Sequence, residues 1–136
     1  MKLLLDTHAL LWYLTTPEKL PAAAYRAIRS ADNDVYASIA SAWEIAIKVA
    51  LGKLEFDATG LAQALPAVGV EPLGISLQHT ARVAELPRHH GDPFDRMLVS
   101  QALIESMTIV SRDRELAKYG VKLLWRDASR ARSRNA

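Results

Sequence analysis

The amino-acid sequence predicts an α/β fold, a three-layer sandwich in which a mostly parallel central sheet lies between two layers of helices. Short apolar stretches that suit strands alternate with longer stretches that suit helices, and parallel neighbours in a sheet need such crossover helices. The first apolar stretch, residues 3–5, is an unbroken run of leucine, which is typical of a strand buried on both faces. We therefore expect this strand in the middle of the sheet.

The expected strands are short and bounded by turn-forming residues, and they cover residues 3–5, 35–37, 70–75, 107–110 and 121–125. The third of them contains Pro72, which has no amide proton to donate to a neighbouring strand. We therefore place that strand at an edge of the sheet.

The expected helices start at capping residues or prolines and end near glycine or proline, and they cover residues 9–14, 20–30, 60–68, 77–86, 93–106 and 113–120. One further helix starts at Ser38 or Ser41 and ends before Gly52. Ser76 and Asp92 suit the N-cap positions of the two helices that follow them. Every strand after the first is thus preceded by at least one helix.

Composition indicates one globular domain over residues 1–125 and a basic tail, 126–136, which we expect to be disordered. Half of the 136 residues are apolar, and the absence of cysteine excludes disulfides and thiolate metal sites. Asp6 and His8 interrupt the apolar N-terminal segment, so we interpret it as structure rather than a signal peptide. No apolar run is long enough to span a membrane. We expect a soluble, cytoplasmic protein.

The net charge of +2 at neutral pH comes from arginines of the tail, because acidic and basic side chains are nearly equal in number before it. Such a balanced body does not predict nucleic-acid binding through its overall field. That function needs a local patch, a metal ion or the tail.

Four acidic residues are the candidate catalytic and metal-binding groups: Asp6, Glu44, Asp95 and Asp113. Each also suits a purely structural role. Asp6 suits a helix N-cap, and Asp95 and Asp113 suit the first turn of a helix. Ser41 and Glu44 have the spacing of a capping box, and Glu44 and Lys48 that of an ion pair on one helix face.

Taken together, the four acids favour a metal site. Asp6 and Asp113 follow apolar strands closely, so we expect them with Asp95 at the carboxyl edge of the sheet, where open α/β sheets bind ligands. Clustered carboxylates repel one another unless cations neutralise them. Oxygen donors favour Mg²⁺, with Mn²⁺ as a substitute. Such ions activate water for phosphodiester hydrolysis, and either one or a pair fits the sequence.

Four stretches of the sequence resemble PIN-domain proteins, and within that family the VapC-type ribonuclease toxins of toxin–antitoxin modules: LLLDTHALLW (3–12), SAWEIAIK (41–48), HGDPFDRMLVSQAL (90–103) and TIVSRD (108–113). The resemblance implies a Mg²⁺-dependent endoribonuclease that a cognate antitoxin inhibits and that forms a homodimer. It also implies that the four acids stand at the family's acidic motif positions. Alternatives are a PIN nuclease of RNA or DNA processing without an antitoxin, and a non-catalytic metal-binding module.

Further residues near the acids are candidates for supporting roles. Thr7 and Ser111 are expected to hold a metal-bound water. His90 is expected to order its loop, and Asp92 to cap a helix. Three arginines are candidates for RNA phosphate binding, with plain charge balance as the alternative: Arg96, Arg112 and Arg114.

The resemblance also implies an antitoxin segment bound in an apolar groove. The candidate anchors are aromatic or apolar side chains, Trp12, Tyr13, Leu14 and Trp43. Packing in the core is the alternative role for each of them.

Overall fold

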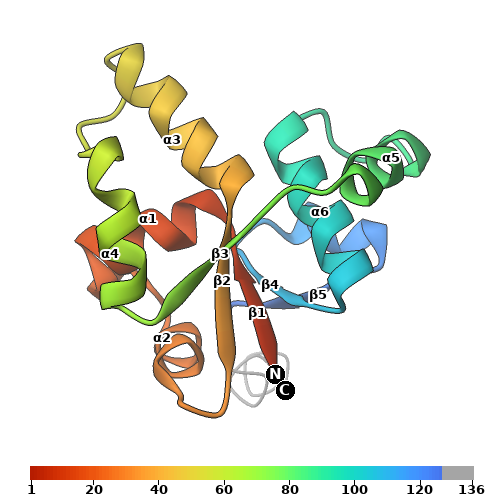
Figure 1. Cartoon of the computed structure of the whole chain (residues 1–136). Coiled ribbons are helices and arrows are strands. Elements are labelled where there is room, and N and C mark those ends of the chain that lie inside the picture. The colour runs from red at the N-terminus through yellow and green to blue at the C-terminus, as the bar shows by residue number, and fades with distance from the viewer. Residues whose placement is uncertain (127–136) are drawn as a thin grey trace.

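The computed structural model describes residues 1–126, so residues 127–136 of the expected tail lie outside the described residues. Figure 1 shows one sheet with helices to either side of it. The strands run in the order β3-β2-β1-β4-β5, and every pair of neighbours is parallel. Their bounds are Lys2–Leu5 (β1), Asp34–Ser38 (β2), Val70–Leu73 (β3), Thr108–Val110 (β4) and Lys122–Leu124 (β5). The predicted α/β class, the central first strand and the edge position of Pro72 are confirmed.

The α-helices lie close to their predicted positions: Thr7–Thr15 (α1), Ala22–Arg29 (α2), Ile39–Ala50 (α3), Leu61–Ala67 (α4), Leu77–Glu85 (α5) and Pro93–Glu105 (α6). The 3₁₀ segments are Pro17–Lys19 (η1), Ala58–Gly60 (η2) and Arg114–Tyr119 (η3). The prediction for 20–30 was wrong at its start, because Leu20 and Pro21 are extended and Pro21 occupies the N-cap. Along residues 1–126, no helix combines the length and apolar character needed to cross a bilayer.

The two faces of the sheet carry separate hydrophobic clusters, because successive side chains of a strand point to opposite faces. Leu3 and Leu5 belong to one cluster, with residues of α1 to α4. Leu4 belongs to the other, with residues of α6, β4 and η3. All three leucines are fully buried. β1 is therefore fixed from both sides, and so is the position of the residue that follows it.

Candidate functional site

The candidate site lies at the carboxyl ends of β1 and β4. These strands are neighbours, with Leu5 paired to Val110, and the Asp6 amide donates a 3.1 Å hydrogen bond to the Val110 carbonyl. The chain proceeds outward from β1 in both directions, through β2 on one side and β4 on the other. Such a reversal of strand order leaves a crevice at the carboxyl edge of an α/β sheet.

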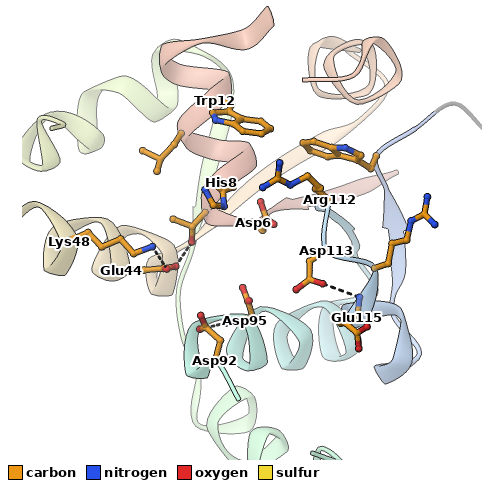
Figure 2. A pocket seen from close by; sticks show the side chains of 14 residues that line it. Asp6, His8, Trp12, Glu44, Lys48, Asp92, Asp95, Arg112, Asp113 and Glu115 are labelled. Atoms are coloured by element: carbon orange, nitrogen blue, oxygen red, sulfur yellow. Dashed lines mark hydrogen bonds and ion pairs between the residues drawn. The ribbon is translucent and has the colours of Figure 1, made fainter. Parts of the chain in front are cut away.

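A cavity of about 570 Å³ occupies this crevice, within the range of roughly 300–1,000 Å³ that ligand pockets span. All four predicted acids line it. Figure 2 shows Asp6, Asp95 and Asp113 around a common space, with Glu44 to one side. The structure thus brings together the four carboxylates that lie far apart in the sequence.

Asp6 combines the two roles that the sequence left open. One oxygen, Oδ1, accepts a 2.8 Å hydrogen bond from the Ala9 amide and so caps α1, while the residue also lines the cavity. Burial raises the pKa of Asp6, and a hydrogen bond from the side chain of Ser111 opposes that rise. Oγ of Ser111 also accepts a 3.0 Å bond from the Asp113 amide. Ser111 therefore connects two of the acids directly.

Glu44 enters the cavity from α3 and is 9% exposed. Thr7 Oγ1 donates a 2.6 Å hydrogen bond to its Oε1, and Nζ of Lys48 lies 3.0 Å from its Oε2. The ion pair with Lys48 that the spacing allowed is present, but only the Lys48 side chain is exposed, at 44%, while Glu44 is buried. The capping-box alternative was wrong: Ser38 caps α3, and Ser41 is buried inside the helix.

Asp95 stands in the first turn of α6, behind a cap that Asp92 forms by accepting bonds from the amides of Phe94 and Asp95. The pKa of Asp95 is raised to about 7, first by burial and then by the charge of Asp92, with smaller contributions from Asp6 and Glu44. Carboxylates crowded in this way favour a proton or a cation among them.

His90 lies between two of the acids. Its Nδ1 accepts a 3.1 Å bond from the Asp92 amide, which orders the loop as predicted. A neutral imidazole then carries its proton on Nε2. That nitrogen lies 3.1 Å from Oδ2 of Asp113 and 3.4 Å from Oδ2 of Asp95. Ligand atoms of these three residues all lie within 4.8 Å of one another.

Asp113 caps η3 by accepting a 3.0 Å bond from the Glu115 amide, one position before the first turn in which the sequence placed it. Its other oxygen, Oδ2, faces His90. Asp95 and Asp113 belong to this close group with His90, and Asp6 and Glu44 line the same cavity. Carboxylate oxygens of this kind fit a hard divalent cation such as Mg²⁺ or Mn²⁺.

Two of the three candidate arginines, Arg112 and Arg114, line the cavity. Arg96 lies outside its lining. The Arg96 guanidinium donates hydrogen bonds of 2.9–3.3 Å to the carbonyl oxygens of Val83, Leu86 and Pro87 and to the hydroxyl of Tyr119. These contacts join α6 to the end of α5.

The candidate anchors for a protein partner do not share one surface. Trp12 lines the acidic cavity, and Tyr13 lines a separate hollow beside Val68 and Gly69. Trp43 is 62% exposed and contacts Phe94 edge-on in an apolar groove of α3, α5 and α6. Trp12, Tyr13 and Leu14 also pack partly against the core.

Sequence reasoning missed some residues that line the cavity, namely His8, Glu115 and Trp125. His8 and Glu115 each stand two positions after a site acid. Trp125 directly follows β5, so it belongs to the same edge of the sheet as Asp6 and Asp113. Its position at the end of an expected strand is the sequence signal that could have identified Trp125 as a cavity residue.

Comparison with known proteins agrees with this geometry. The PIN domain family model matches residues 3–122. Ribonuclease VapC22 of Mycobacterium tuberculosis is 31% identical over 123 residues, which cover 85% of this chain and 90% of the relative.

Solved structures with the same fold include VapBC2 from Rickettsia felis bound to a promoter DNA fragment, with a TM-score of 0.69 and 16% identity over 92% of this chain and 99% of the matched one. DNA-bound VapBC from Salmonella typhimurium has a TM-score of 0.61 and 20% identity over 91% and 97%. Since the family model covers most of the chain, the chain belongs to the PIN domain family.

Proposed function

We propose that this protein is a Mg²⁺-dependent endoribonuclease, the VapC-type toxin of a toxin–antitoxin pair. The observation that carries the proposal is the meeting of Asp6, Glu44, Asp95 and Asp113 in one cavity at the switch point of the sheet. The name of the M. tuberculosis relative, a ribonuclease, supports the choice of RNA as substrate.

The four carboxylates would hold Mg²⁺, or Mn²⁺ in its place. When bound, the ion neutralises the phosphodiester and acidifies water for attack on phosphorus. Thr7 and Ser111 would support this site by orienting two of its carboxylates. Thr7 donates a hydrogen bond to Glu44, and Ser111 donates one to Asp6. The pKa of Asp95 is raised to about 7, so a cation held there would compete with a proton for this carboxylate.

We assign Arg112 and Arg114 to binding RNA phosphates, and their position in the lining of the acidic cavity supports this role. The body of the protein is nearly neutral, so it attracts RNA weakly over long range. We therefore assign single-stranded or looped RNA as the substrate, whose unpaired bases offer further contacts.

A cognate antitoxin and a second copy of the chain are the proposed protein partners. The support for the antitoxin is that the solved neighbours are VapBC assemblies. Co-expression with the product of any small adjacent gene, followed by size-exclusion chromatography with light scattering, tests both partners. A monomer that the adjacent product neither binds nor inhibits would favour a PIN nuclease without an antitoxin.

The decisive experiment is cleavage of total cellular RNA by the purified protein, with cleavage sites mapped by sequencing. We expect cleavage with Mg²⁺ that is lost with EDTA and in Asp6→Asn and Asp95→Asn, and products with 5′-phosphate and 3′-hydroxyl ends. Asp32→Asn, at an exposed position outside the cavity, is the matched control and keeps wild-type activity. Wild-type cleavage rates in Asp95→Asn would overturn the assignment.

A further inference from the structure

One wall of the acidic cavity is aromatic. Trp12 on α1 and Trp125 after β5 both line it, and their ring centroids are 6.0 Å apart with planes tilted by 40°. Both side chains are partly exposed. Two indoles from opposite ends of the chain thus form one surface beside the carboxylates.

Arg112 belongs to the same wall. Its guanidinium carbon lies 5.3 Å from the centroid of the Trp12 ring, a cation–π distance. Figure 2 shows the Arg112 side chain between Trp12 and the acids Asp6 and Asp113. Arg112 therefore carries positive charge at the boundary between the aromatic wall and the acids.

The guanidinium and the two indoles beside the acids suit the phosphate and the base of a nucleotide. A phosphate needs cations, and an unpaired base gains most from a flat aromatic or guanidinium surface. Trp12 and Trp125 also pack partly against the core, but core packing does not require that both indoles and the Arg112 guanidinium border a polar cavity.

We propose that Trp12 and Trp125, with the Arg112 guanidinium, form a stacking surface for a nucleobase of single-stranded RNA, next to the phosphodiester that the acids act on. The inference rests on the proposed function and adds a subsite to it. The Arg112 guanidinium, which lies over the Trp12 ring, can be part of this surface because guanidinium planes also stack on bases.

The test measures how tightly the protein binds two probes in a buffer that contains Ca²⁺, by fluorescence or by competition. One probe is an oligoadenylate of about 12 nucleotides, and the other is an inorganic polyphosphate of similar length. We expect Trp12→Leu and Trp125→Leu to weaken oligoadenylate binding by about 10-fold or more, since stacking on an aromatic side chain contributes that much per base. Polyphosphate has no bases, so its binding stays unchanged. Trp12→Phe keeps an aromatic ring and retains most of the affinity.

Trp43→Leu is the matched control. Trp43 is an exposed tryptophan that lines a different groove, so its loss leaves both probes unaffected. Circular dichroism and thermal melting of each variant establish that it is folded. If Trp12→Leu fails to fold, the wild type itself is compared on oligoadenylate and on an abasic RNA of the same length, and we expect it to bind the abasic RNA about 10-fold more weakly.

Equal weakening of both probes, or oligoadenylate binding that is the same in the wild type and both leucine variants, would overturn the stacking surface. So would a wild type that binds oligoadenylate no better than abasic RNA. These outcomes can be distinguished from failure of the nuclease proposal. If the protein cleaves RNA with Mg²⁺ but binds it equally well without the tryptophans, only the stacking surface is refuted. If RNA binding depends on the tryptophans but no cleavage occurs, only the nuclease proposal is refuted.

Discussion

The Thr7 hydroxyl donates a 2.6 Å hydrogen bond to Oε1 of Glu44 and so joins the first turn of α1 to the middle of α3. Both side chains are buried. Oγ of Ser41 lies 3.0 Å from the same hydroxyl oxygen, and Lys48 holds the second oxygen of Glu44. The orientation of this carboxylate is therefore set by the fold itself.

Thr7→Val removes that hydroxyl with little change in volume. We expect the free energy of unfolding to fall by about 2 kcal/mol, since the lost bond has a charged acceptor. RNA cleavage at low Mg²⁺ should fall by about 10- to 100-fold, as is usual when a group that orients a metal ligand is removed. Urea denaturation and a Mg²⁺ titration measure the two effects. Thr7→Ser should restore both, and an unchanged Mg²⁺ titration in Thr7→Val would contradict the role.

Asp95→Asn should stabilise the metal-free protein at high pH. The pKa of Asp95 is raised from 3.8 to about 7 in the folded state, so between these values the folded state keeps a proton that the unfolded state has released. Stability from this group therefore falls as the pH rises through that window. Urea unfolding in EDTA should show a gain for Asp95→Asn above about pH 7 that shrinks towards pH 4. A gain of the same size at every pH would refute this explanation.

His90→Ala should move the acidic limb of the pH–rate profile to higher pH. The pKa of Asp95 is raised mainly by burial and the charge of Asp92, and His90 opposes that rise. Without His90, the carboxyl group keeps its proton to a higher pH. His89→Ala is the control, because His89 packs edge-on against Tyr119 and is absent from the lining of the acidic cavity. Profiles that coincide for wild type and His90→Ala would count against this coupling.

Arg96→Ala should lower stability and leave RNA affinity intact. Its guanidinium holds the carbonyls at the end of α5, and hydrogen bonds from a charged donor contribute about 2 kcal/mol or more. Denaturant unfolding and RNA binding are measured on the same preparation. Arg88→Ala, at an exposed site in the loop after α5, should change neither. If Arg96→Ala is as stable as the wild type but binds RNA more weakly, Arg96 contacts the RNA after all.

Mg²⁺ should raise the melting temperature of the wild type. A ligand that binds only the folded state at about 100 times its Kd adds about 2.7 kcal/mol. We expect the shift to be lost in Asp6→Asn and kept in Asp32→Asn, with NaCl of equal ionic strength as the salt control. Equal shifts in the wild type and Asp6→Asn would place the binding elsewhere.

The sheet and the convergence of the acids were accessible from the sequence because both follow from local patterns. The unbroken leucines of β1 identify a buried strand, and Pro72 identifies an edge. An acid that ends a central strand must lie at the carboxyl edge. The start of α2 was harder, because Pro21 suits both a cap and a first turn, and tertiary packing decides between them.

The side-chain contacts of the site were not accessible in the same way. His90 lies near both Asp95 and Asp113 because the loop before α6 comes close to the residues that follow β4, and this contact is not encoded by local spacing. Arg96 lies outside the acidic cavity, and its guanidinium donates hydrogen bonds to carbonyl oxygens just after α5. Trp12 and Trp125 meet through the order of strands in the sheet, which no spacing in the sequence encodes.

The pairing of Leu5 with Val110 has a consequence during synthesis. Asp6 is synthesised first, and β4 and Asp113 follow it by more than 100 residues. A growing polypeptide therefore carries an incomplete pocket for most of its synthesis. The acidic pocket is complete only once β4 has paired with β1.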